Sequence, residues 1–311
     1  MKKINYMMLS CLFVLLGSCT EEVQQKEQPV PEGGKDAATR QEVMLNLKNK
    51  LILDREKTKG ETIATAEENA ISALDVYVFA SETENGDYSF MERFAYRNTP
   101  DAVLPAGASE LQLTPTDADA KETTGLLKVK KGLFVKLYCI ANNTTLVDPA
   151  HEGQPVDDAA FVPLELSTTD DNKTTVKTPG APLETTFATW HTHLLTSTVQ
   201  ADTLATPLAM TGALTTPLDL TDFGSAARVQ AGIRLTRLVA RYDIINEAGT
   251  SRFTIETVSM GNARRGSDLF PIRPYGDMPE AKPDELITTP ERRFYGENAN
   301  KGIQAGGFYS Y

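Results

Sequence analysis

The chain is poor in cysteine, with 3 in 311 residues. Cys11 lies inside an N-terminal apolar run, Cys19 directly follows that run, and Cys139 stands alone in a later apolar stretch. Because the first is expected to leave with a signal peptide and the second to carry a lipid, no intramolecular disulfide is expected. Packing must then supply the stability, and we expect Cys139 to be a small buried hydrophobic residue.

The chain also has few positive charges for its size, with a formal net charge of −11. A polyanion gains nothing from a phosphate backbone, so nucleic acid is not an expected partner. The basic pairs Arg264-Arg265 and Arg292-Arg293 are too short to form a basic stripe. After the N-terminal run, no apolar stretch approaches the length of a membrane span.

Sequence motifs of enzymes are missing as well. The Gly-x-Ser-x-Gly, Walker-type and dinucleotide-binding glycine patterns are absent. His191 and His193 would share one face of a strand and could hold a metal, but without a third ligand we favour surface histidines. The acidic clusters 117–119 and 170–172 lack the spacing of a calcium loop. We therefore expect no catalytic residue, no metal ligand, no cofactor and no enzymatic activity.

The N-terminus has the layout of a bacterial lipoprotein signal. Lys2 and Lys3 precede the apolar run Ile4–Leu16, and small residues lead to Ser18 and Cys19. This order predicts a signal peptide of 18 residues, cleavage between Ser18 and Cys19, and a lipid on the Cys19 thiol. The mature chain would then be attached to a membrane without crossing it. The alternative is an ordinary secretory signal that happens to end in a cysteine.

Residues 19–41 are rich in Glu, Gln, Lys, Pro and Gly and predict a flexible tether. Thr20 is not the aspartate that directs inner-membrane retention in many Gram-negative bacteria. Glu21 and Glu22 resemble the surface-export signal of Bacteroidetes lipoproteins. We therefore expect a surface-exposed protein anchored to the cell outer membrane by its lipid.

Beyond the tether the dominant hydrophobic period is two, as in half-buried strands. We expect an all-β fold of two Greek-key-like β-sandwich domains, residues 42–230 and 231–311. The second has about 80 residues where a sandwich needs roughly 100, so it is either incomplete or a small complete domain. The expected strands are 42–53, 71–79, 126–129, 133–141, 208–212, 214–220, 232–245 and 253–260, with coil or strand at 185–190.

Arg55 follows the first expected strand. A protease that cut after Arg55 would release that strand and leave a groove in the sandwich. The alternative is a surface arginine in a linker, and the flanking Asp54 and Glu56 make Arg55 a poor site for many arginine-specific proteases. An exposed polar loop is nevertheless where proteolysis concentrates.

These features in this order resemble the Bacteroidetes fimbrillins. The resemblance covers the lipoprotein signal and continues to about Pro271. It is carried by the first strand with its following arginine, Ile71–Phe79, Leu137–Asn142, Pro207–Thr211, Leu235–Arg241 and Phe253–Phe270.

The resemblance implies two β-sandwich domains and a role in pili, cell adhesion and virulence. Polymerising subunits of the family travel as palmitate-type lipoproteins, lose their first strand to an arginine-specific protease, and accept a strand from a neighbouring subunit. An anchoring subunit keeps its lipid and its first strand. The chain most resembles the anchor, which implies lipid on Cys19, a retained strand at 42–53, a place at the fimbrium base, and other fimbrial subunits as partners through strand donation.

Three other functions remain open from the sequence. The chain could be a polymerising or tip subunit cut at Arg55. It could be a surface glycan-binding lipoprotein, which would need exposed aromatic platforms that Trp190 and scattered tyrosines hardly supply. A lipoprotein enzyme lacks any matching set of residues.

Overall fold

The computed structural model describes residues 39–49, 65–99, 101–116, 122–143, 145–151, 154–168, 174–197, 199, 202–222, 227–242, 257–270, 282–293 and 308–311. Residues 38–311 form one compact unit. Ser18, Cys19 and Arg55 lie outside the described residues, as do residues 20–38 of the expected tether and the acidic clusters 117–119 and 170–172. The tether is expected to extend to residue 41, but Arg40 and Gln41 already belong to the first strand. None of the described helices is long and apolar enough to cross a membrane.

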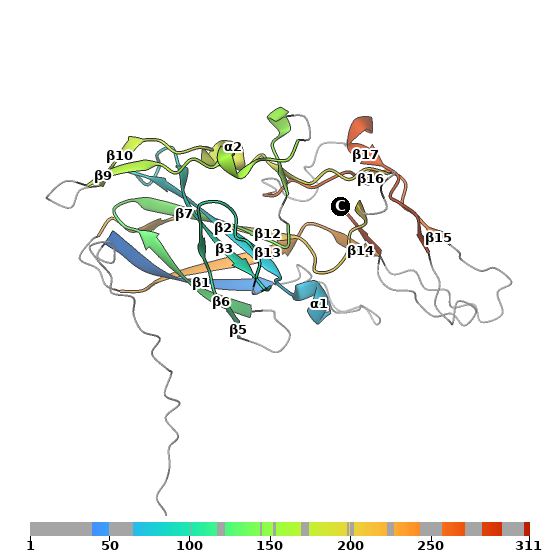
Figure 1. Ribbon diagram of the computed structural model, residues 1–311, viewed down its shortest axis with the longest axis horizontal. Helices are drawn as coiled ribbons and strands as arrows, with labels where there is room; N and C mark the ends of the chain where they lie inside the picture. Colours follow the sequence, from blue (N-terminus) through green and yellow to red (C-terminus); the bar gives the residue numbers. More distant parts are fainter. Residues whose placement is uncertain are drawn as a thin grey trace, which may run out of the picture. The chain divides into compact units, whose positions relative to one another are not determined.

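The fold is all-β, as the sequence predicts (Figure 1). Nine strands form one curled sheet: β1 (Arg40–Asn49), β2 (Ala73–Ser81), β3 (Ser89–Arg97), β4 (Ala108–Glu110), β5 (Leu113–Pro115), β6 (Glu122–Lys130), β7 (Phe134–Ala141), β12 (Met210–Asp219) and β13 (Val229–Arg237). Their order across the sheet is β4-β3-β2-β7-β12-β13-β1-β6-β5.

The remaining elements are short. The strands are β8 (Leu146–Val147), β9 (Glu165–Thr168), β10 (Thr174–Thr178), β11 (His191–Thr192), β14 (Ala240–Tyr242), β15 (Thr257–Val258), β16 (Ala263–Arg264), β17 (Leu286–Ile287), β18 (Arg292–Arg293) and β19 (Phe308–Ser310). The helices are α1 (Ala66–Asn69), α2 (Glu184–Phe187) and the 3₁₀ turns Pro149–His151, Asp158–Ala160 and Pro283–Glu285.

The curled sheet folds over itself into two layers at the contact between β12 and β13. Only two residue pairs join these strands, Met210 with Arg237 and Thr211 with Thr236. Gly212 lies at this corner, where an added Cβ would come within 2.3 Å of the Arg234 carbonyl oxygen. The front layer is then β13-β1-β6-β5 and the back layer is β12-β7-β2-β3-β4. Inward-facing side chains of both layers form the main core, as in a β-sandwich.

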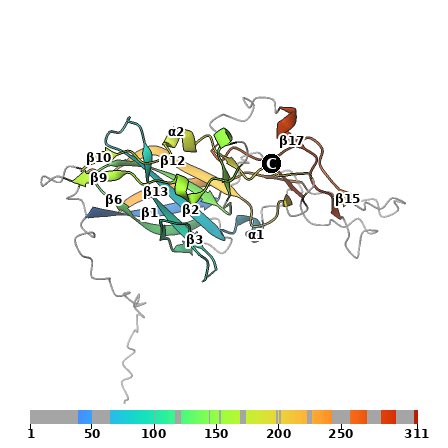
Figure 2. The same ribbon diagram turned by 45° about the horizontal axis from the view of Figure 1, so that its top comes forward.

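The two layers differ in how they are covered. The front strands alternate strictly between buried and more exposed residues, so their outer face is open to solvent. Strand β2 is buried on both faces over almost its whole length. A second apolar cluster explains this, because α2 and the loops around it cover the outer face of the back layer (Figure 2). It contains Tyr77, Phe79, Tyr88, Phe90, Tyr138, Ile140, Leu146, Phe187, Trp190, Leu238, Leu269 and Phe270.

Several details of the sequence prediction are confirmed. Lys131-Gly132 is a turn signal in the sequence between the expected strands 126–129 and 133–141. It separates β6 from β7, and Gly132 has the positive φ of +97° that glycine tolerates best. Cys139 is fully buried in the main core.

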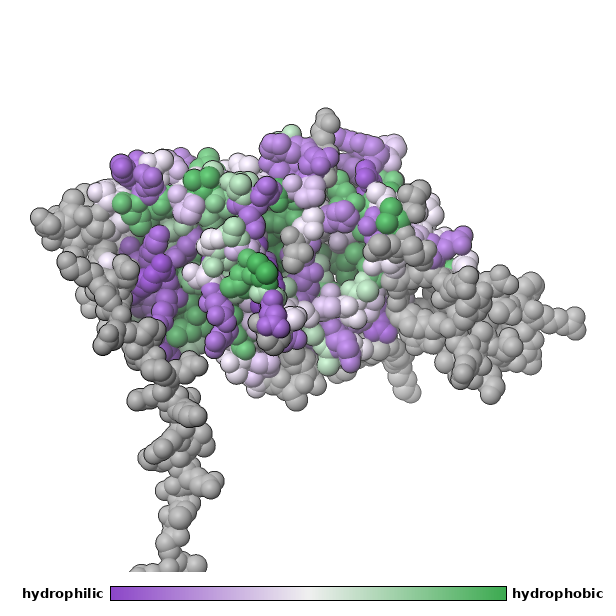
Figure 3. All heavy atoms as spheres, in the orientation of Figure 1, coloured by the Kyte–Doolittle hydropathy of each residue, from purple (hydrophilic) through white to green (hydrophobic). Residues whose placement is uncertain are grey.

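On the face shown in Figure 3, hydrophobic residues form separate small groups between hydrophilic ones.

Other details are corrected. The segment 185–190 overlaps α2, because burying Phe187 and Trp190 on the back layer overrides the weak helix propensity of this stretch. The two strands expected at 208–220 are the single strand β12, whose pairing with β7 is interrupted between Leu214 and Leu218, next to Pro217.

The expected boundary after residue 230 falls inside β13. This strand pairs with both β1 and β12, so the first sheet continues to Arg237. Beyond Arg237, the strands in the described parts of the chain pair two at a time: β14 with β19, β15 with β18, and β16 with β17.

Candidate functional site: the slot of the first strand

The first strand of the described chain lies inside the front layer rather than at its edge. Strand β1 runs parallel to β13 on one side and antiparallel to β6 on the other. Val43, for example, is opposite Val229 and Leu127. We call the space between β13 and β6, which β1 fills, the β1 slot.

The inward side of β1 is a continuous part of the main core. Val43, Leu45 and Leu47 are at most 1% exposed. Full burial of an aliphatic side chain stabilises by about 1.5–3 kcal/mol, so these three contribute roughly 5–9 kcal/mol. That is comparable with the whole stability of a typical domain. The slot therefore has to be filled by a strand for the fold to persist.

The outward side of β1 carries polar pairs to both neighbours. Glu42 pairs with Arg228 of the segment before β13 at 2.8 Å. The Asn46 amide donates to Gln230 Oε1 at 2.8 Å. These exposed contacts contribute little energy. They distinguish one register of β1 from another. A shift by one residue would break these pairs and would bring Leu45 to the solvent side.

Lys48 adds an ion pair to Glu122 of β6 at 3.0 Å. With the contacts of Glu42 and Asn46, it completes a row of three polar pairs along the outer face of β1.

The N-terminal end of β1 is tied to both layers. Arg40 Nη1 donates to Glu92 Oε2 of β3 at 2.9 Å and to the Lys128 carbonyl oxygen of β6. Glu92 Oε1 accepts from the Lys130 backbone N–H at 2.9 Å. Gln41 is buried and donates to the Ala227 carbonyl oxygen. These contacts close the slot at the end where the chain enters it.

The C-terminal end of β1 meets the helix α1. The Asn49 side-chain amide donates to the Asn69 carbonyl oxygen at 2.9 Å. Arg237, at the end of β13, donates in turn to Asn69 Oδ1. Thr65 and Glu68 form a capping box at the start of α1. The next described residue after Asn49 is Thr65, so the segment with Arg55 connects the slot to this helix.

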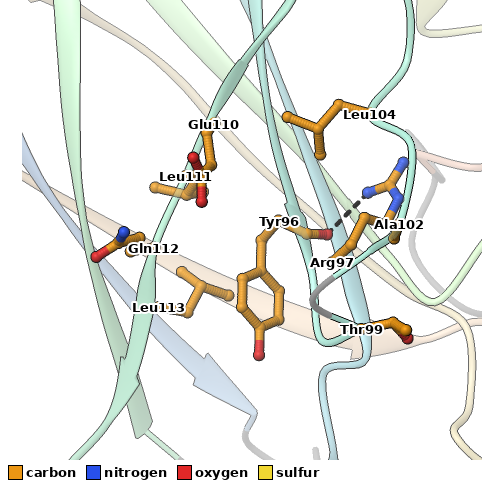
Figure 4. A pocket seen from close by; sticks show the side chains of 9 residues that line it. All are labelled: Tyr96, Arg97, Thr99, Ala102, Leu104, Glu110, Leu111, Gln112 and Leu113. Atoms are coloured by element: carbon orange, nitrogen blue, oxygen red, sulfur yellow. Dashed lines mark hydrogen bonds between the residues drawn. The ribbon is translucent and has the colours of Figure 1, made fainter.

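A pocket of about 430 Å³ lies elsewhere, at the edge of the sandwich where the chain passes from β4 to β5 (Figure 4). The Arg97 guanidinium is already engaged, with the Tyr96 carbonyl oxygen at 2.8 Å and with Asp75. This pocket is a less specific candidate than the β1 slot. It is lined by Tyr96, Arg97, Thr99, Ala102, Leu104, Glu110, Leu111, Gln112 and Leu113.

A buried charge cluster lies on the covered face of the back layer. Asp75 has a side chain only 2% exposed and pairs with Arg93 at 3.2 Å and with Arg97 at 3.0 Å. Arg93 also reaches Asp158 at 2.8 Å and stacks over the Tyr77 ring. Because every member has a partner of opposite charge, the cluster fixes the covering loop to the sheet rather than offering a reactive group.

A second polar group lies beside the aromatic cluster. Glu184 of α2 pairs with Lys136 at 2.9 Å and accepts a hydrogen bond from the Tyr138 hydroxyl. Burial raises the pKa of Tyr138, and the hydrogen bond and charge of Glu184 raise it further. Burial likewise raises the pKa of the Cys139 thiol, which leaves it poorly nucleophilic. These shifts have structural causes, since the Tyr138 hydroxyl is held by Glu184 and Cys139 is enclosed by the main core.

The two candidate metal-binding histidines have separate partners. His191 Nδ1 lies 2.8 Å from Asp268 Oδ1, and His193 Nε2 lies 3.5 Å from Asp202 Oδ1. Within the described residues no group of three potential ligands forms. Trp190, the candidate for a glycan platform, is only 2% exposed.

Comparison of the chain with protein-family models, with curated proteins and with solved structures gives no match. The functional argument therefore depends on the sequence and on the geometry described above.

Sequence reasoning identified the first strand but missed the polar contacts that hold its two ends. The capping box at Thr65 and Glu68 can be read from the Thr-x-x-Glu spacing. The partners of Arg40 and Asn49 cannot, since they lie on β3, β6 and α1 and are brought together only by the fold.

Proposed function

We propose that the protein is a lipid-anchored fimbrial subunit that attaches the fimbrium to the outer membrane and limits its length. Cys19 carries the lipid, and β1 stays in its slot. Neighbouring subunits connect to it through strand donation. The proposal combines the lipoprotein signal with the resemblance to the fimbrillins.

One observation supports the proposal most. β1 is an interior strand with a parallel neighbour, and it connects to the rest of the described chain only through the segment that contains Arg55. β1 could leave the sheet without another element having to unthread. Its departure would expose the facing edges of β13 and β6 with their main-chain groups unpaired. A strand from another subunit pairs with such edges by main-chain hydrogen bonds.

The same geometry serves a polymerising or tip subunit, which differs in losing β1 after a cut at Arg55. The hydrogen bonds that hold the two ends of β1 favour retention and therefore the anchor. A glycan-binding lipoprotein is disfavoured by the burial of Trp190. Tyr242 is the exposed aromatic residue among the described large apolar side chains, at 45%.

The test is mass spectrometry of the protein purified from outer membranes of the producing bacterium. For an anchor, we expect an N-terminal peptide with acylated Cys19 and recovery of the tryptic peptide 41–48 from β1. A mature N-terminus at Glu56, abolished by Arg55→Ala, would instead establish a polymerising subunit.

Genetic variants complete the test. Cys19→Ala should release the protein from the membrane fraction, whereas Cys139→Ala, which changes the buried thiol, is the matched control. Deletion of the whole chain should release long fimbriae into the medium. Fimbriae that stay attached and of normal length in the deletion strain would refute the anchoring role.

A further inference from the structure

A buried carboxylate joins three parts of the chain that are far apart in sequence. The Glu68 side chain in α1 is only 4% exposed. Its Oε1 accepts from Arg241 Nη1 of β14 at 2.8 Å and from the Tyr309 hydroxyl of β19 at 3.0 Å. Its Oε2 accepts from the Thr65 backbone N–H at 3.1 Å.

The segment held by Glu68 has little strand pairing of its own. β19 pairs with β14 over three residues, and Tyr309 is opposite Arg241. An isolated two-stranded pair of this length is not stable in water. Side-chain anchors must therefore hold residues 308–311 in place.

Two more anchors act on this segment besides Tyr309. Ser310 is 1% exposed, and Tyr311 packs against the aromatic cluster. Burial raises the pKa of Tyr311, against the effect of its hydrogen bond with Thr192.

The charge of Glu68 matters beyond its hydrogen bonds. Arg237 lies nearby, and burial lowers its pKa, while Glu68 and Tyr309 act in the opposite direction. Glu68 thus pairs with Arg241 at 2.8 Å, and its charge also acts on Arg237, which donates to the neighbouring Asn69. Without the negative charge of Glu68, the repulsion between Arg237 and Arg241 would no longer be offset.

The helix that carries Glu68 also contacts β1. The Asn69 carbonyl oxygen accepts from the Asn49 side chain, and Asn69 Oδ1 accepts from Arg237. In Figure 1, α1 lies near the end of β1. The helix α1 thus contacts β1 through Asn69 and carries the Glu68 carboxylate on the residue before it.

We propose that Glu68 is a latch that holds residues 308–311 on β14 and that, through α1, makes the docking of this segment depend on β1. The two states are the segment docked and the segment released. Release leaves the edge of β14 unpaired and therefore open to another strand. Because coupling is reciprocal, β1 should in turn be held more firmly when the segment is docked. This inference does not rest on the proposed fimbrial role.

The test is hydrogen exchange of the full-length protein, followed by mass spectrometry of peptides that cover 308–311 and β14. A hydrogen bond to a charged group contributes enough that Glu68→Gln should speed exchange at residues 309–310 by about tenfold or more. Exchange in β2 and β7 should not change. Glu67→Gln, which changes the exposed glutamate beside Glu68 in the same helix, should have no effect.

Tyr309→Phe serves as an independent variant if Glu68→Gln fails to fold. It removes one hydroxyl and leaves the pair of Glu68 with Arg241 intact, and it should speed exchange at 309–310 several-fold. Unchanged exchange at these residues, or faster exchange throughout the protein, would overturn the latch.

The dependence on β1 has its own measurement. Asn49→Ala should speed exchange at 309–310 by about threefold in the wild-type background, since the net value of one neutral hydrogen bond is of that order. In the Glu68→Gln background, Asn49→Ala should have no further effect. Additive effects of the two substitutions, or no effect of Asn49→Ala, would show that α1 does not transmit the state of β1.

Discussion

The packing of β1 leads to a quantitative prediction for Leu45→Ala. Leu45 is fully buried at the centre of the strand, between its neighbours Val43 and Leu47. Replacement of a buried leucine by alanine removes its transfer free energy and leaves a cavity, at a cost of about 3 kcal/mol. For a folded unit of this size, each kcal/mol lowers Tm by roughly 2–4 °C, so the expected change is about 6–12 °C.

Urea unfolding followed by fluorescence measures this effect. The chain has one tryptophan, and Trp190 lies on the far face of the back layer, in the second apolar cluster. A loss of stability at Leu45 that is detected by Trp190 therefore reports cooperative unfolding of both layers. The m-value should stay unchanged.

The matched control is Met44→Ala in the same strand. Met44 faces outward and is half-buried, so its truncation should cost about 1 kcal/mol or less. If Leu45→Ala lowers the midpoint no more than Met44→Ala, β1 is not packed in the slot as described, and the argument for an exchangeable interior strand is refuted.

Three further predictions concern buried groups. Asp75→Asn should destabilise the protein by about 3–5 kcal/mol in urea unfolding, because it leaves Arg93 and Arg97 side by side without their carboxylate; a loss below about 1 kcal/mol would contradict the buried ion pairs. Burial raises the pKa of Tyr88 to about 12, so between about pH 10 and 12 the unfolded chain loses the Tyr88 proton before the folded chain does. The free energy of unfolding should therefore fall as the pH rises through this window. A Tyr88→Phe variant should show a shallower fall in alkaline titrations. In a chain that starts after Cys19, Cys139 is the remaining thiol, and it should react with Ellman's reagent only on unfolding in urea; reaction under native conditions would contradict its burial.

The front layer could be predicted from the sequence in some detail. The alternation of Val43, Leu45 and Leu47 indicates a strand with one buried face, and the structure gives these residues that role. The turn at Lys131-Gly132 could also be predicted from the sequence, since glycine accepts the positive φ found there. In both cases a local pattern determines the local structure.

The back layer was harder to predict because it is covered twice. The run from Val76 to Ala80 is apolar on both faces, which signals a strand buried on both sides. What covers it could not be inferred, since Phe187 and Trp190 come from a stretch with weak helix propensity that folds only against the sheet. Long-range packing, not local preference, determines that helix.

The Glu68 latch shows the same limit for polar groups. The capping box is a local signal, but Arg241 and Tyr309 are 173 and 241 residues away from Glu68. Only the fold brings them to one carboxylate. A sequence pattern can therefore identify Glu68 as a helix cap and still miss its larger role.

The difference between the two layers bears on which strand can be exchanged. Strands β2 and β7 lie in the back layer, where the main core covers one face and the aromatic cluster covers the other, so the removal of either would open both. Strand β1 lies in the front layer and contributes buried side chains to one core alone. Among the described strands, pairing between the front and back layers is limited to the two residue pairs of β12 and β13. Replacement of β1 by another strand therefore rebuilds one core, while the aromatic cluster and the ion pairs around Asp75 keep their contacts. This asymmetry is a physical reason why the slot of an interior strand can be the variable part of an otherwise fixed sandwich.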